Sequence, residues 1–281
     1  MDRRHFLRLA GGAAGAAALA ACGSDGPSSD FVASRLFDSR ALQVDGTPQR
    51  MVWAVQRDGS YVADELADVV RVTAVQNDTT LFDADVTTRR DGLVVPYLPV
   101  EMVFPSTDPV EFTFEGGGQR WTSFAGATGT GNEPIVRPGQ AFPTVATPTF
   151  ADAAGVDPIC TRRPDPCPFH DVSLDAALAD GQPVVLLLST PAFCANLIAC
   201  GPVLDILIGA EASIPADAAV VHAEIYSAPT GRDPGPVSPA MAASGAWFEP
   251  MLYLIDGSGT VTSRLDFMWD SSELIDALAA F

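Results

Sequence analysis

The stretch STPAFCANLIACGPVLDI, residues 189–206, decides how the second half of the chain is interpreted. It reads as the end of a buried strand, a turn that carries Cys194, and a helix that begins near Cys200. Two thiols at a strand-to-helix junction indicate redox chemistry, because the unpaired N–H groups of a helix N-terminus stabilise a thiolate. Cys194 is the candidate nucleophile, since the thiolate is the species that attacks a disulfide.

Strands and helices are predicted on both sides of this stretch. The apolar run at 183–189 is typical of a strand buried on both faces. Later strands are predicted at 218–227, 250–256 and 260–267. Helices are predicted after the capping residue Ser173, from about Cys200 to Gly209, and over 271–281.

Three features of this half resemble the thioredoxin-like superfamily over about residues 149–281. The aromatic Phe193 stands directly before Cys194, Pro202 follows eight residues after that cysteine, and Glu249-Pro250 precedes a strand. The order of strands and helices is also similar to that of the thioredoxin fold. The resemblance implies an α/β thioredoxin-like domain and a cis peptide bond at Pro250.

The same resemblance implies a site and an activity. Pro250 and Thr190 would line the groove that holds a substrate chain. The implied activity is thiol–disulfide exchange on envelope proteins that carry thiols or disulfides, with Cys194 attacking and Cys200 resolving.

The spacing of the two thiols departs from the family pattern. The resolving cysteine of a thioredoxin stands three residues after the attacking one, where this chain has Leu197. Cys200 is six residues on, and six residues of unbroken helix rise about 9 Å, which puts the thiols beyond disulfide reach. Residues 195–199 are therefore predicted to form a loop, with the helix beginning near Pro202.

Three other functions stay open at this stage. The run T-P-A-F-C is loosely similar to a peroxiredoxin loop, although Thr190 is one residue too far from the cysteine. A non-catalytic binding module with two structural disulfides explains the cysteines equally simply. Copper handling requires a histidine near both thiols, for which His170 and His222 are the candidates.

Cys160 and Cys167 lie in a proline-rich segment with His170. The three resemble part of a metal site, but a fourth ligand is missing from the local sequence. An even number of cysteines in an exported chain favours disulfides, and nearness in sequence favours the pairs 160–167 and 194–200. We therefore predict a Cys160–Cys167 disulfide, and neither a metal nor a cofactor.

No carboxylate stands on the strand that leads to Cys194. His222 and Glu224 alternate with apolar residues on a neighbouring predicted strand, so they share a face and one of them can reach the site. The more ordinary interpretation is that both are polar residues at a strand end.

Residues 31–125 follow a different pattern. Short β-branched or aromatic runs alternate with turn signals, which indicates an all-β sandwich with an immunoglobulin-like shape. The predicted strands are 51–56, 69–75, 83–88, 100–104 and 110–115. Residues 126–148, rich in Gly, Thr and Pro, are predicted to link this domain to the domain at 149–281.

The N-terminus predicts location. Residues 1–21 combine paired arginines with a short Ala/Gly-rich run, as in a secretory signal, and resemble the twin-arginine export motif. Leu19-Ala20-Ala21-Cys22 resembles the bacterial lipobox, which implies lipidation of Cys22 and a tether over 22–30. The expected product is an exported lipoprotein on the outer face of the bacterial cytoplasmic membrane, held there through its lipid.

Composition excludes several function classes. The chain has 35 acidic and 16 basic residues and a formal charge of −19, so it repels a phosphate backbone and nucleic-acid binding is not expected. All basic residues are Arg, which excludes Schiff-base lysine chemistry and a Walker-type phosphate site.

Overall fold

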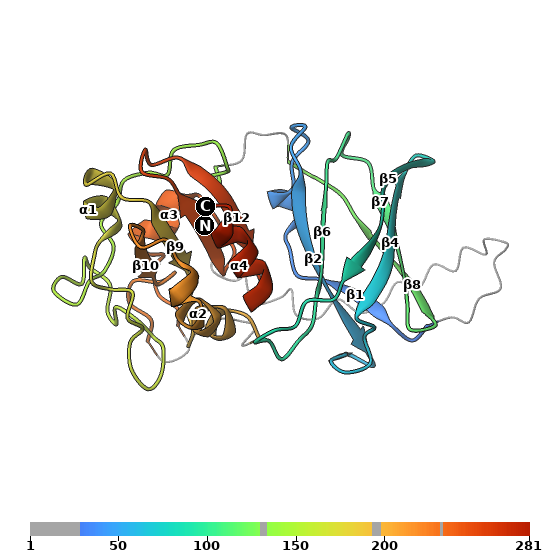
Figure 1. Cartoon of the computed structure of the whole chain (residues 1–281), viewed down its shortest axis with the longest axis horizontal. Coiled ribbons are helices and arrows are strands. Elements are labelled where there is room, and N and C mark those ends of the chain that lie inside the picture. Colours follow the sequence, from blue (N-terminus) through green and yellow to red (C-terminus); the bar gives the residue numbers. More distant parts are fainter. Residues whose placement is uncertain (1–28, 130–133, 193–197, 231–232) are drawn as a thin grey trace.

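The computed structural model describes residues 29–129, 134–192, 198–230 and 233–281. Within these ranges the chain forms three four-stranded sheets, two in the N-terminal half and one in the C-terminal half (Figure 1). Cys22, Cys194 and the predicted signal peptide lie outside the described residues.

The N-terminal half consists of two antiparallel sheets that face each other across one apolar core (Figure 1). One sheet has the order β1-β2-β3, with β6 paired to β2, and the other has the order β5-β4-β7-β8. Trp53, Phe112 and Phe114 are fully buried between the sheets. The strands are β1 (Val32–Arg35), β2 (Gln49–Arg57), β3 (Ser60–Tyr61), β4 (Val69–Gln76), β5 (Thr79–Thr87), β6 (Leu98–Met102), β7 (Val110–Gly116) and β8 (Gln119–Ala125).

The C-terminal half is built around one mixed sheet with the order β10-β9-β11-β12. β9 and β10 are parallel, whereas β11 runs antiparallel to both β9 and β12. The strands are β9 (Val184–Leu188), β10 (Ala219–Ala223), β11 (Met251–Ile255) and β12 (Val261–Asp266). The helices are α1 (Leu174–Ala179), α2 (Cys200–Gly209), α3 (Pro239–Ser244) and α4 (Ser271–Ala279), with 3-10 turns η2 (Ser39–Ala41) and η3 (Glu211–Ser213).

The central strand β9 is buried on both faces, as its continuous apolar run predicts. Leu186 contributes to the core on the side of α1 and α3. Val185 and Leu187 contribute to the opposite core, which α2 and α4 cover. His222 of β10 is paired in register with Leu187, in the middle of these apolar layers.

The predicted strands and helices are confirmed in type and approximate position. The structure adds β1, β3, β8 and α3, which the sequence patterns did not indicate. Ser173 is the N-cap of α1, as predicted. Helix α2 begins at Cys200, as the apolar pattern indicated, and therefore two residues before Pro202, where the loop argument placed its start. The Glu249–Pro250 peptide bond is cis, also as predicted.

The predicted fold class is wrong. The structure is mostly β-sheet, with 34% strand and 15% helix, and the described residues contain only four short α-helices, which does not fit an α/β thioredoxin-like fold in the C-terminal half. The segments that connect the strands of the C-terminal half explain why so little of it is helical. Residues 134–172, where the proline-rich segment lies, contain no helix or strand, and α1 and α3 have six residues each.

The two halves are joined by polar contacts around Arg50 of β2. Its guanidinium pairs with Glu273 of α4 at 2.7 Å and donates to the carbonyl oxygens of Asp266 and Met268. The hydroxyl of Tyr97 donates to the same Glu273 carboxylate. No helix in the described part of the chain is long and apolar enough to cross a membrane.

Truncation of Leu186 to Ala tests the central position of β9. Because the side chain is fully buried, we expect the free energy of unfolding to fall by about 2–5 kcal/mol. Urea unfolding followed by circular dichroism measures the change. Ile275→Ala, at a position that is 44% exposed on α4, is the control and should change stability by about 0.5 kcal/mol or less. Equal losses in the two variants would contradict the assignment.

Candidate metal centre

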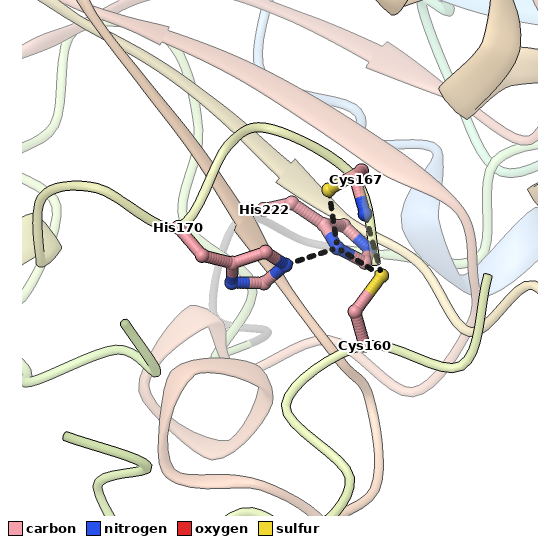
Figure 2. Close-up of side chains that lie close together, drawn as sticks. All are labelled: Cys160, Cys167, His170 and His222. Carbon is pink, nitrogen blue, oxygen red and sulfur yellow. Dashed lines mark hydrogen bonds between the residues drawn. The ribbon is translucent and has the colours of Figure 1, made fainter. Parts of the chain in front are cut away.

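Four side chains meet beside the C-terminal sheet: Cys160, Cys167, His170 and His222 (Figure 2). The first three come from the loop that precedes α1, and His222 comes from β10. One ligand atom of each residue lies within 4.8 Å of the others. All four residues are buried, and the two cysteines pack into the apolar core that contains Val185 and Leu187.

The distances between these atoms are short. His222 Nδ1 lies 3.6 Å from Cys160 Sγ and 3.4 Å from Cys167 Sγ. The same Nδ1 lies 3.4 Å from His170 Nε2, as the dashed lines in Figure 2 show. His222 Nδ1 is therefore the point on which the other three donor atoms converge.

Neighbouring groups favour one tautomer of each imidazole. His170 Nδ1 lies 3.1 Å from the carbonyl oxygen of Pro148, and His222 Nε2 lies 3.2 Å from the carbonyl oxygen of Ser189. A carbonyl oxygen only accepts, so each of these nitrogens can donate its hydrogen there. With the hydrogens so placed, His170 Nε2 and His222 Nδ1 present lone pairs, and these two nitrogens face each other.

The electrostatics favour a cation between these groups. Interaction with Cys167 lowers the pKa of Cys160, with help from His170 and His222, against the opposing effect of burial. Burial lowers the pKa of His222, but its hydrogen bond to Cys160 and the negative charge there raise it overall. The hydrogen bond with Cys160, together with burial, raises the pKa of Cys167. In the absence of a metal these shifts describe one thiolate, at Cys160, which would attract a positive charge.

The loop carrying the cysteines is attached to its surroundings on both sides. The backbone N–H of Cys167 donates to Cys160 Sγ at 3.4 Å. The backbone N–H of Thr161 donates to Glu224 at 2.5 Å, and Arg162 pairs with Asp205 of α2 at 3.0 Å. Burial raises the pKa of Glu224, while its bonds to Thr161 and the charge of His222 oppose that rise.

The predicted disulfide between Cys160 and Cys167 is wrong, because both cysteines are free. Instead of pairing, the two sulfurs both lie within 3.6 Å of the His222 ring. The ligand that the local sequence lacked is His222, which stands 52 residues beyond His170.

Cys200 occupies a separate site at the first residue of α2. It is disulfide-bonded, and the free thiols Cys160 and Cys167 are not its partners. The predicted attacking residue Cys194 lies outside the described residues, as does the predicted lipidation residue Cys22. Cys200 Sγ lies 3.5 Å from Glu249 Oε2.

The predicted groove residues lie next to Glu249. Pro250 is its neighbour in sequence, and Thr190 hydrogen-bonds to it, which lowers the carboxyl pKa. Burial and the charge of Glu224 have the larger effect and raise the pKa of Glu249 to about 7. Thr190 is fully buried and accepts a hydrogen bond from the Ile225 N–H at 2.9 Å.

From the sequence His222 was a candidate beside Cys194 and Cys200; its place beside Cys160 and Cys167 was missed, and Glu249 was missed altogether. His222 interrupts the apolar run AVVHA, and that interruption was the available signal for a buried ligand. Glu249 was missed because a carboxylate was sought on the strand before Cys194, whereas Glu249 approaches from the residue before β11.

Comparison of the chain with protein-family models, with curated proteins and with solved structures finds no match. The function is therefore argued from the geometry of the two sites.

Alkylation distinguishes the observed thiols from the predicted disulfide. In denaturant with a chelator and no reductant, we expect iodoacetamide to modify Cys160 and Cys167, because both are free, and to leave Cys200 unmodified. Peptide mapping by mass spectrometry measures the labels, and a sample reduced beforehand, in which Cys200 is also labelled, is the control. Unlabelled Cys160 and Cys167 would contradict the structure.

Proposed function

We propose that the chain is a zinc protein and that Cys160, Cys167, His170 and His222 are the four ligands of a structural Zn²⁺ ion. One observation carries the proposal: two imidazole nitrogens face each other at 3.4 Å, with two sulfurs beside them, and all four are buried. When the other ring nitrogens donate to carbonyl oxygens, these two nitrogens present lone pairs that cannot hydrogen-bond to each other, and buried polar groups without partners are costly. A cation among the four atoms satisfies all of them.

The distances support tetrahedral coordination. Zn–S bonds of about 2.3 Å and Zn–N bonds of about 2.0–2.1 Å place tetrahedral ligands about 3.6 Å apart for S···N and about 3.3 Å apart for N···N. The observed values are 3.6 and 3.4 Å for the two S···N pairs and 3.4 Å for the N···N pair. The three edges that meet at His222 Nδ1 therefore have the lengths that a tetrahedral zinc site requires, and the other ligand atoms lie within 4.8 Å of one another.

The donor set favours zinc over other metals. Two thiolates with two imidazoles in a tetrahedron are typical of Zn²⁺, and the two thiolate charges neutralise the ion. Four protein ligands leave no open position for water or substrate, and the ligands are at most 5% exposed. These features support a structural role instead of a catalytic one.

The outer contacts also fit a metal site. Ligating histidines usually donate their other ring N–H to a carbonyl or a carboxylate, which orients the ring. His170 does so to Pro148, and His222 does so to Ser189. In this role the ion would hold the loop before α1, which has no strand or helix of its own, against β10.

Zinc content tests the proposal. We expect one Zn²⁺ per wild-type chain by elemental analysis after gel filtration, and a Cys167→Ser variant that retains less than about a tenth of it, because a hydroxyl is a poor ligand for zinc. Cobalt substitution should give the visible absorption of tetrahedral Co²⁺ bound to thiolate.

Cys200→Ser is the matched control, since it makes the same change at the cysteine outside the cluster. Full zinc content in Cys200→Ser with loss in Cys167→Ser is the predicted pair of results. A wild-type chain without zinc, or a Cys167→Ser variant that keeps it, would remove the basis of the proposal.

We propose thiol–disulfide exchange at Cys200 as a second function. The observation that favours it is the Glu249 carboxylate, 3.5 Å from Cys200 Sγ and with a pKa raised to about 7 by burial and by the charge of Glu224. A carboxyl group that titrates near neutral pH is suited to exchange a proton with a departing thiolate.

A dithiol would reduce the Cys200 disulfide in two successive displacements. A thiolate of a dithiol reductant attacks the sulfur that is bonded to Cys200, and the S–S bond breaks. Cys200 leaves as a thiolate and takes the proton of Glu249. The second thiol of the reductant then attacks the reductant's own sulfur in the mixed disulfide, and the protein cysteine that had been bonded to Cys200 leaves as a thiolate and takes up the proton of the attacking thiol. Two electrons have then passed from the dithiol to the protein, and the reductant has become a disulfide.

A Glu249→Gln variant tests the role of the carboxyl. In the wild type the Glu249 carboxyl group is protonated below pH 7, whereas above pH 7 its negative charge opposes the thiolate that forms at Cys200. Thr190, Glu224 and Tyr226 are the polar groups around it. We expect the wild-type rate of reduction by dithiothreitol, corrected for the thiolate fraction of the reagent, to fall through pH 7 by roughly tenfold or more.

In Glu249→Gln the corrected reduction rate should not fall through pH 7. Glu211→Gln, the same change at an exposed glutamate, should show the same fall as the wild type. Parallel pH profiles in the wild type and Glu249→Gln would exclude proton transfer by Glu249. Unchanged exchange with protein disulfides in Cys194→Ser and Cys200→Ser variants, or a wild type without exchange, would exclude the second function.

The proposed location follows from the N-terminal sequence alone. We infer export and a lipid anchor at Cys22, which would place both sites in the bacterial envelope, where partners with thiols or disulfides occur. A Cys22→Ser variant that stays in the membrane fraction would contradict the anchor.

A further inference from the structure

We propose that the metal centre controls the rate at which the Cys200 disulfide is reduced, by holding residues 189–192 in place. The inference rests on the proposed zinc site and concerns its regulatory effect on the second site. Its basis is that two ligands of the centre are attached, one directly and one through the next residue, to opposite ends of this short segment.

The first attachment is at Ser189, the residue after β9. His222 Nε2 lies 3.0 Å from Ser189 Oγ and donates to its carbonyl oxygen at 3.2 Å. Both residues are fully buried. A metal bound at Nδ1 would fix the plane of this ring, and the ring would then fix the backbone of Ser189.

The second attachment is at Ala192. Thr161 follows the ligand Cys160, and its Oγ1 accepts a hydrogen bond from the Ala192 N–H at 3.1 Å. Thr161 is itself held by Glu224, through its backbone N–H at 2.5 Å and its hydroxyl at 3.2 Å. The position of Thr161 therefore depends on the same loop that supplies the metal ligands.

The segment leads directly to the disulfide site. Thr190 lies between the two attachments and hydrogen-bonds to Glu249. Glu249 Oε2 lies 3.5 Å from Cys200 Sγ. A continuous set of contacts therefore runs from Cys160 and His222, through residues 189–192 and Glu249, to Cys200.

The direction of the effect follows from burial. Cys200 is fully buried, so its sulfur can separate from the sulfur to which it is bonded only after a local opening of the structure. An ion that holds the loop and the His222 ring strengthens both attachments and makes opening rarer. Loss of the ion should make opening, and therefore reduction, more frequent.

The test compares reduction rates in the full chain with zinc bound and after its removal by a chelator. Reduction by excess dithiothreitol transfers two electrons from its thiols to the disulfide, and the appearance of alkylatable Cys200 is followed by mass spectrometry. We expect the disulfide of the zinc-free chain to be reduced about tenfold faster or more. Without the ion both attachments weaken, and together they amount to more than one hydrogen bond.

A Thr161→Val variant separates this link from general loss of stability. The change removes the hydrogen bond to Ala192 and the hydroxyl contact with Glu224 but leaves all four ligands in place. We expect this variant to bind one zinc ion and yet to be reduced roughly five- to tenfold faster than the zinc-bound wild type. Of the two contacts removed, only the hydrogen bond to Ala192 holds residues 189–192, and loss of one buried hydrogen bond implies a change of that size.

Thr147→Val is the matched control. Thr147 is also buried and also accepts a hydrogen bond from a backbone N–H, but the donor is Leu174, at 2.9 Å, and not a residue of the segment 189–192. It should be reduced at the wild-type rate with zinc bound.

The outcomes distinguish the two proposals. Zinc measured at one per chain, with equal reduction rates in the zinc-bound wild type, the zinc-free chain and Thr161→Val, would overturn the inference and leave the zinc site standing. A wild-type chain that binds no zinc would overturn both. Equal acceleration in Thr161→Val and Thr147→Val would overturn the specific link through Ala192.

Discussion

Four donor atoms meet in an apolar part of the C-terminal half, and the structure around them depends on how their charges and lone pairs are satisfied. Two cysteine sulfurs, two imidazoles and the nearby carboxyl group of Glu224 are buried there together. Leaving such groups without partners costs several times the net value of a hydrogen bond. A divalent ion satisfies the four ligands at once, which is why the proposed zinc ion is central to this account.

The same constraint explains how an irregular loop can be well positioned. The residues from 134 to 172 form no strand or helix, so they have no ladder of backbone hydrogen bonds to hold them. Their attachments are isolated backbone hydrogen bonds, such as those of Val136 to Ser244 and of Asp157 to Ser227, together with the cysteine and histidine cluster, the bonds of Thr161 to Glu224, and the Arg162–Asp205 pair. A bound metal ion would add to these contacts, because the free energy of metal binding contributes to folding.

Local structure was predictable from the sequence, and long-range convergence was not. The apolar run of β9, the start of α2 at Cys200 and the cap at Ser173 follow from patterns within a few residues. The fold class failed because it required helical layers that the proline-rich loop does not form. The disulfide prediction failed because nearness in sequence favoured Cys160 with Cys167, while the structure brings His222 from β10 to both sulfurs. The Cys200–Glu249 contact was missed for the same reason, since 49 residues separate its partners.

X-ray absorption at the zinc edge tests the central claim most directly, because it reports the atoms bound to the metal in the purified wild-type chain. The account predicts a first shell of two sulfurs at about 2.3 Å and two nitrogens at about 2.0–2.1 Å. A shell of oxygen and nitrogen atoms without sulfur, or the absence of zinc from the protein, would contradict it.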